Sequence, residues 1–225
     1  MVIVPSINVS RSGDPTFPNL FSEDLHVFTQ LGLRVVNVPL AFPATNTKDA
    51  FAAWQKSSAA AIAEVARTLR KQYPALPICT YGHDRAGYVA LAAAASMDNA
   101  LTCVTAINPV ATAQDLFNTD INIDNRQKTE TVMRIRYLGF MGLDSTNIAT
   151  PVEVSSWAAS LPNKVWLATH PREFNIEHIK NLRDAIKDAD KAVTWLSPDP
   201  DREDHGEWRA EVLQKLTDYI VGLKP

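Results

Sequence analysis

Short apolar runs alternate along the chain with longer segments that mix polar and apolar residues. Most of these runs are continuously apolar, which is typical of strands buried on both faces of a sheet. The predicted strands are Val2–Pro5, Leu33–Val38, Pro77–Tyr81, Cys103–Ile107, Lys164–Ala168 and Ala192–Leu196.

The segments between the strands carry helix signals. Ser22 begins a capping pattern, and Gly32 ends the same helix. The predicted helices are Ser22–Leu31, Ala50–Gln72, Ala86–Met97, Ile176–Ala189 and Glu207–Leu223. Strands and helices alternate with short connections, which predicts an α/β fold: a mostly parallel, doubly wound sheet of about six strands with helices on both faces.

The length of 225 residues predicts a single domain spanning 1–225. The one long interruption between consecutive strands, at about 111–162, predicts a small insertion with a helix around Val152–Ser160. The first residues already form a predicted strand. We therefore expect that leading strands of the fold are missing, or that the chain was cut from a longer protein.

The net charge of −3, without a long basic run, argues against nucleic acid or an anionic membrane surface as a partner. The apolar start of the chain is too short for a signal peptide, and no apolar run approaches the ~18 residues of a membrane span. We expect a soluble, cytoplasmic protein. Its oligomeric state is left open, with a homo-oligomer as one alternative.

Two cysteines, Cys79 and Cys103, lie in predicted strands. Free cysteines are among the most buried residues, so we expect two buried core thiols. Adjacent strands would bring the two close, but nothing in the sequence requires a disulfide. Metal-ligand spacings of Cys and His are not found, and neither a metal nor a cofactor is expected.

The motif Gly82-His83-Asp84-Arg85-Ala86-Gly87 follows a predicted strand and opens an alanine-rich helix. Strand, sharp turn and helix, with small residues around a central reactive side chain, resemble the nucleophile elbow of α/β-hydrolases. In most such enzymes the central residue is Ser, whereas this chain has Asp84. The carboxylate is either a nucleophile that forms a covalent ester, or the replacement of a lost serine in a scaffold.

The expected order of such a site along the chain is nucleophile, acid, histidine. His205, in a polar loop after the last predicted strand, is the candidate base, with a solvated loop histidine as the alternative. The acid is Glu173, after the fifth strand, unless Asn108 orients the histidine through its amide oxygen. His83 and Asn108 are candidates for the substrate pocket.

An oxyanion hole requires two backbone donors. One is the N–H of the residue after the nucleophile position, here Arg85. The other is expected after the first strand, where Ser6 or Ile7 offers an N–H but no glycine eases the turn.

From the elbow to the C-terminus the chain resembles the catalytic domain of the prolyl oligopeptidase family. The similar motifs are the elbow stretch Tyr81–Leu91, the Arg136–Gly139 and Thr150–Val152 segments, and the terminal loop Asp204-His205-Gly206. The resemblance implies an α/β-hydrolase fold. It also implies an altered triad, with Asp84 at the serine position and Phe174 at the aspartate position.

The elbow alone also resembles that of haloacetate dehalogenases and epoxide hydrolases, in which Asp is the nucleophile. Those enzymes carry larger caps, and here Tyr137 and Trp157 are the aromatic residues of the expected insertion.

Together these features predict a prolyl-oligopeptidase-like α/β-hydrolase domain with an altered catalytic triad. It is expected to be weakly active or catalytically degenerate, a pseudoenzyme in the second case. The first alternative is an Asp-nucleophile hydrolase of the dehalogenase or epoxide hydrolase type, and the second is a non-catalytic interaction scaffold. The expected partner is a small-molecule ester or halide, or a peptide substrate.

Overall fold

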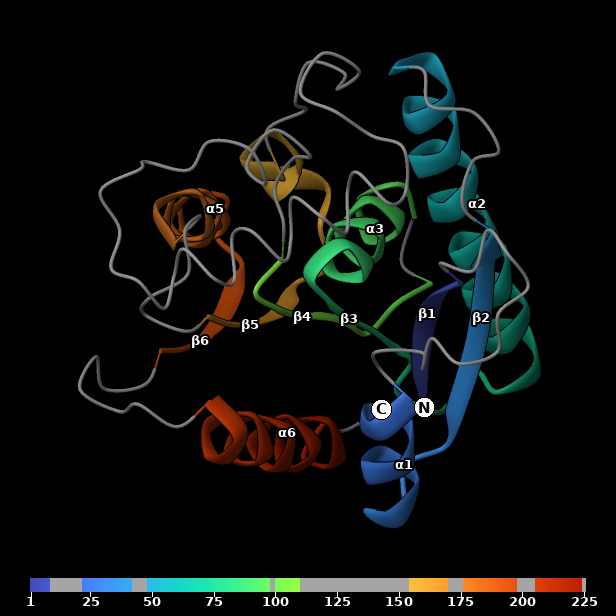
Figure 1. Cartoon of the computed structure of the whole chain (residues 1–225), viewed down its shortest axis with the longest axis vertical. Coiled ribbons are helices and arrows are strands. Elements are labelled where there is room, and N and C mark those ends of the chain that lie inside the picture. The colour runs from blue at the N-terminus through green and yellow to red at the C-terminus, as the bar shows by residue number, and fades with distance from the viewer. Residues whose placement is uncertain are drawn as a thin grey trace.

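The apolar runs form one parallel sheet. The computed structural model describes residues 1–8, 22–41, 48–97, 100–109, 154–169, 176–197 and 205–223. The strands are β1 (Val2–Asn8), β2 (Val35–Ala41), β3 (Cys79–His83), β4 (Cys103–Ile107), β5 (Lys164–Ala168) and β6 (Ala192–Leu196). They form a 6-stranded sheet in the order β2-β1-β3-β4-β5-β6, and every neighbouring pair is parallel. The predicted sheet is confirmed (Figure 1).

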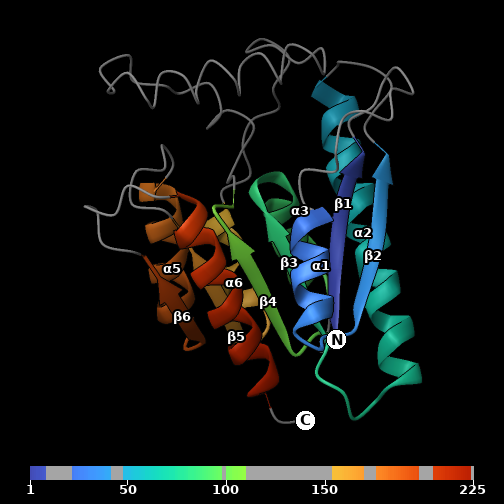
Figure 2. The same ribbon diagram turned by 60° about the horizontal axis from the view of Figure 1, so that its bottom comes forward.

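Helices cover both faces of this sheet. They are α1 (Ser22–Gln30), α2 (Lys48–Gln72), α3 (Asp84–Ala95), α5 (Ile176–Asp188), α6 (His205–Val221) and the 3-10 helix η2 (Val154–Ser160). Helices α1 and α6 lie on one face, and α2, α3, η2 and α5 lie on the other (Figures 1 and 2). Within the described ranges, none of the helices is both long and apolar enough to cross a membrane.

The helix expected around Val152–Ser160 is present as η2. Most of the expected insertion, residues 111–153, lies outside the described residues.

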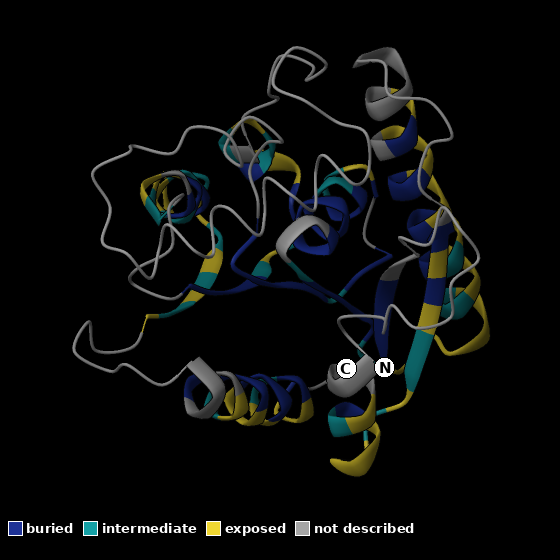
Figure 3. Cartoon of the chain, viewed as in Figure 1, coloured by how far each residue is buried: buried dark blue, intermediate teal, exposed yellow. Residues whose placement is uncertain are grey.

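The sheet separates two hydrophobic cores. Successive strand residues point to opposite faces, so Ile3 belongs to the core under α2 and α3 while its neighbours Val2 and Val4 belong to the core under α1 and α6. In the second core, the Phe28 ring of α1 meets the Tyr81 ring of β3 edge to face, with centroids 4.9 Å apart. Figure 3 shows this burial concentrated along the central strands and on the inner sides of the helices.

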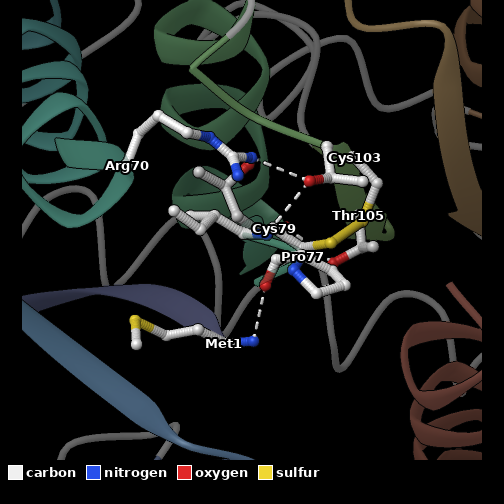
Figure 4. Close-up of a disulfide and its surroundings, with 9 residues drawn as sticks. Met1, Arg70, Pro77, Cys79, Cys103 and Thr105 are labelled. Atoms are coloured by element: carbon white, nitrogen blue, oxygen red, sulfur yellow. Dashed lines mark hydrogen bonds between the residues drawn. A yellow bond between two sulfur atoms is a disulfide. The ribbon is translucent and has the colours of Figure 1, made fainter. Parts of the chain in front are cut away.

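The expectation of two free thiols was wrong. Cys79 and Cys103 pair directly across β3 and β4, with Cα atoms 4.7 Å apart, and their sulfurs form a disulfide (Figure 4). Both residues are fully buried, as expected. Apolar patterns place a cysteine in a strand, but only the register of the two strands decides whether two sulfurs meet.

A half-buried arginine stabilises the amino-terminal edge of the sheet near this disulfide. Arg70 of α2 donates to the Thr102 hydroxyl at 2.9 Å (Figure 4). It donates as well to the carbonyl of Ala100 at 3.2 Å. It also donates to the carbonyls of Pro74 and Leu76 at 3.1 and 2.9 Å. The guanidinium thus joins the end of α2 to the loops that enter β3 and β4.

The strand order has one switch point. From β1 the chain moves outward to β2, then crosses back to β3 on the other side of β1 and continues outward to β6. In open parallel sheets, ligands bind outside the carboxyl ends of the strands at such a point. The end of β3, where the elbow motif stands, is therefore the place to look for a site.

Candidate functional site

The turn at the end of β3 contains no loop residue. Strand β3 ends at His83 and α3 begins at Asp84. His83 is the N-cap of the helix, with an extended backbone at φ −116° and ψ 142°, and is half-buried. The helix starts two residues earlier than the predicted Ala86. Asp84 therefore stands at the amino end of α3, at the carboxyl edge of a central strand.

The small residues of the motif are required by close contact. A Cβ atom on Gly82 would lie 2.2 Å from the carbonyl oxygen of Ala86 and 2.4 Å from the amide nitrogen of Gly87. Both are backbone atoms, which cannot turn aside as a side chain can. The first turn of α3 thus folds back directly onto β3. This contact shows why position 82 holds glycine, and the role of the turn as a nucleophile elbow stays a prediction.

Asn108 lies beside this turn, one residue beyond Ile107, the register partner of His83. Its backbone is left-handed at φ 43°, a conformation that asparagine tolerates better than most residues, and it is buried. Its N–H donates to the carbonyl of Ala168 at the end of β5 at 2.8 Å. Asn108 is therefore held at the carboxyl edge of the sheet, and its role in a substrate pocket stays a prediction.

The next residue, Pro109, packs against Gly87 in the first turn of α3. A Cβ on Gly87 would lie 3.1 Å from the Cβ of Pro109. The chain leaving β4 therefore packs against the first turn of α3, which brings the Asn108 backbone next to the elbow.

The two predicted oxyanion donors in β1 differ in direction. Both lie within the strand, which extends to Asn8, beyond the predicted end at Pro5. The N–H of Val2 donates toward β2, to Arg34, and backbone groups alternate sides along a strand. The N–H of Ser6 therefore faces β2, whereas that of Ile7 faces the β3 side. This geometry favours Ile7 over Ser6 as the donor.

The remaining predicted groups are only partly described. His205 is the first residue of α6, which follows β6, so its backbone comes after the last strand as expected. The side chains of Asp84, Arg85 and His205 lie outside the described part of the structure, and Glu173 lies outside it altogether. The described residues contain no group of three or more His, Cys, Asp or Glu that could hold a metal ion.

Tyr88 was not predicted to have a role. It follows Asp84 by four residues in α3, about one helical turn, and its ring lies 5.2 Å from that of Trp157 in η2. Burial raises the pKa of Tyr88 to about 12. The four-residue spacing from Asp84 could have indicated that Tyr88 lies near the turn. The contact with η2 could not be predicted, because it joins two elements that are distant in the sequence.

Comparison with known proteins supports the fold. No family model matches the chain, and no curated protein does. Among solved structures, an esterase of the fungus Rhizomucor miehei superposes with a TM-score of 0.66 at 12% identity, covering 98% of this chain and 72% of that one. The S-formylglutathione hydrolase of Staphylococcus aureus superposes with a TM-score of 0.55 at 15% identity, covering 98% and 81%.

A third similar structure is dipeptidyl peptidase 4 of Porphyromonas gingivalis, with a TM-score of 0.51 at 15% identity over 75% of this chain. The matched region spans only 22% of that peptidase. These structural neighbours, like a monoacylglycerol lipase of Paleococcus ferrophilus, share one architecture although their reactions differ. The chain described here has the α/β-hydrolase fold.

Proposed function

We propose that this chain is a hydrolase domain with an altered catalytic triad, in which Asp84 stands at the nucleophile position. The single observation that carries the proposal is the turn itself. The backbone of Ala86 and Gly87 packs so closely on Gly82 that no side chain fits at position 82. The residue at the start of α3 is an aspartate. The similarity of the elbow and the His205 loop to the prolyl oligopeptidase family supports a hydrolase ancestor.

The aspartate decides which reactions remain available. A serine alkoxide that attacks an ester or amide gives an acyl-enzyme, which water then hydrolyses. A carboxylate that attacks the same carbonyl would give an anhydride, a poor intermediate for peptide cleavage. Ester and peptide hydrolysis at this site is therefore weak or lost, and the domain is a degenerate serine hydrolase.

The position of Asp84 also favours a second candidate function, attack on a saturated carbon. The amino end of the helix dipole stabilises a negative charge there, which keeps a carboxylate in its nucleophilic form. Its oxygen would form a bond to the carbon of an alkyl halide or epoxide, while the carbon–halogen or carbon–oxygen bond breaks and the leaving group takes the electron pair. Water, deprotonated by His205, would then cleave the ester at the Asp84 carbonyl and release an alcohol.

The experiment compares wild-type protein with Asp84→Ser and Asp84→Asn on a p-nitrophenyl ester, a proline-containing peptide ester, chloroacetate and an aryl epoxide. If the proposal holds, wild-type protein hydrolyses esters slowly or not at all, and Asp84→Ser hydrolyses them faster than wild type. Asp188→Asn, an exposed aspartate of α5, is the matched control and should behave as wild type.

Other outcomes decide between the alternatives. Conversion of chloroacetate or the epoxide by wild type, abolished in Asp84→Asn and in His205→Ala, would select the Asp-nucleophile candidate. Ester turnover unchanged in Asp84→Asn would place the reaction elsewhere and overturn both. If folded Asp84→Ser is as inactive as wild type on every substrate, the hydrolase proposal fails and a non-catalytic scaffold is left.

A further inference from the structure

A cavity lies on the side of α3 that faces away from the sheet. It is lined by α2, α3 and η2, is open to the surface, and has a volume of about 550 Å³. We call it the α2–α3 groove and define it by Lys56, Ala59, Ala63 and Arg67 of α2, Tyr88 of α3 and Trp157 of η2. The groove begins about one helical turn past the elbow and involves none of the proposed catalytic residues.

The α2 side of the groove is a single stripe of the helix. Lys56, Ala59, Ala63 and Arg67 follow one another at three- or four-residue spacing, so they share one face. The small alanine side chains leave the space between the helices open. Lys56 and Arg67 are eleven residues apart, which places them at opposite ends of the stripe, about 16 Å apart along the helix axis. The groove is therefore long, apolar in its middle and cationic at its two ends.

The two cations differ in what they already bind. Arg67 pairs with Glu64 of its own helix at 3.3 Å. Lys56 forms no ion pair with any residue that the structure describes. Helix α2 runs antiparallel to the strands, so Lys56 lies toward the carboxyl edge of the sheet and Arg67 toward the opposite edge. An anionic group in the groove would therefore pair with Lys56.

Tyr88 supplies a second polar contact. The residue as a whole is 7% exposed and lines the groove, and its hydroxyl makes no hydrogen bond to any described residue. The hydroxyl oxygen can be reached from the groove and is not sealed in the core, so it is available to hydrogen-bond a ligand. Tyr88 stays protonated at neutral pH and can donate to a ligand oxygen. Its ring and that of Trp157 form an apolar wall beside the alanine stripe.

We infer that the α2–α3 groove binds a linear amphipathic carboxylate of the medium-chain fatty acid class. The carboxylate would pair with Lys56 and accept from the Tyr88 hydroxyl, and the alkyl chain would lie along the alanine stripe. A second copy of this chain is a poorer occupant. The large hydrophobic residues exposed in the described part, Leu31, Tyr73, Leu76 and Val221, lie at helix ends and in a loop and form no insertable helix face.

The test is a calorimetric titration of the purified protein with decanoate and, separately, with decanol. Decanoate should bind at one site, and Lys56→Gln should weaken it about two- to fivefold, as expected for the loss of an exposed ion pair. Tyr88→Phe should weaken it less. Decanol lacks the charge and should bind wild type about as weakly as decanoate binds Lys56→Gln.

Two further variants keep the result interpretable. Ala60→Trp fills the groove from an exposed rim position and should abolish binding without disturbing the core. Lys180→Gln, an exposed lysine of α5 outside the groove, is the matched control and should bind as wild type. Binding should also persist in Asp84→Asn. The inference is overturned if decanoate shows no saturable binding below about 1 mM. It is also overturned if decanol binds equally well, or if Ala60→Trp binds as wild type.

Discussion

Cys79 and Cys103 stand directly opposite each other on the two strands that flank the elbow, and their disulfide crosses the centre of the sheet. The bond closes a loop with a sequence separation of 24, which contains the elbow and all of α3. The candidate nucleophile is thus carried on a covalently closed segment. Disulfides persist mainly in oxidising compartments, so this bond weighs against the expected cytoplasmic location.

The first prediction concerns this bond. Reduction should lower the free energy of unfolding by about 3 to 4 kcal/mol, because the chain-entropy model gives that value for a loop of this length. Urea denaturation with and without dithiothreitol measures the difference. The double variant Cys79→Ala/Cys103→Ala should show no dependence on dithiothreitol. A wild-type midpoint that dithiothreitol leaves unchanged under fully reducing, unfolding conditions would contradict the prediction.

The second prediction tests the contact at the elbow. Gly82→Ala should destabilise the protein by about 3 kcal/mol or more, because the added Cβ would overlap the carbonyl of Ala86. Gly32→Ala is the comparison. Gly32 has open space around it but a backbone at φ +83°, so alanine there should cost only about 1 to 2 kcal/mol. Equal losses in the two variants would argue against a tight turn at β3.

The third prediction concerns Arg70. Arg70→Ala should lower stability by about 2 kcal/mol, because four hydrogen bonds to the loops before β3 and β4 are lost together. Arg70→Lys should recover little of this, since an ammonium lacks the planar fork of donors. On the same helix, Arg67→Ala removes only an exposed ion pair and should change stability by less than about 1 kcal/mol. Thermal unfolding of the three variants would decide the point.

The fourth prediction follows from the pKa of Tyr88, which burial raises from 10.0 to about 12. The folded state holds the phenolic proton more tightly than the unfolded state does. The resulting contribution to stability is therefore complete below pH 10 and is lost as the pH rises toward 12, in total about 3 kcal/mol. Unfolding of wild type and Tyr88→Phe across this range measures the difference. The wild-type curve should fall more steeply, and parallel curves would be the contrary result.

The sheet could be predicted from the sequence because each strand is a local apolar run with its own boundaries. The core strands Cys103–Ile107 and Lys164–Ala168 were predicted to the residue. The disulfide could not be predicted, since it depends on the register between β3 and β4. The choice between Ser6 and Ile7 likewise required the direction of the β1 ladder. The α2–α3 groove depends on how α2, α3 and η2 pack together, and η2 lies far from the two helices along the chain.

The contact between Gly82 and Ala86 has a wider meaning for this domain. It fixes the path of the backbone around position 84 without involving the side chain that stands there. The backbone conformation of this turn therefore depends on Gly82 and Ala86, whereas its chemical reactivity depends on the side chain at position 84. A substitution at position 84 could therefore change the type of reaction without requiring a new backbone conformation.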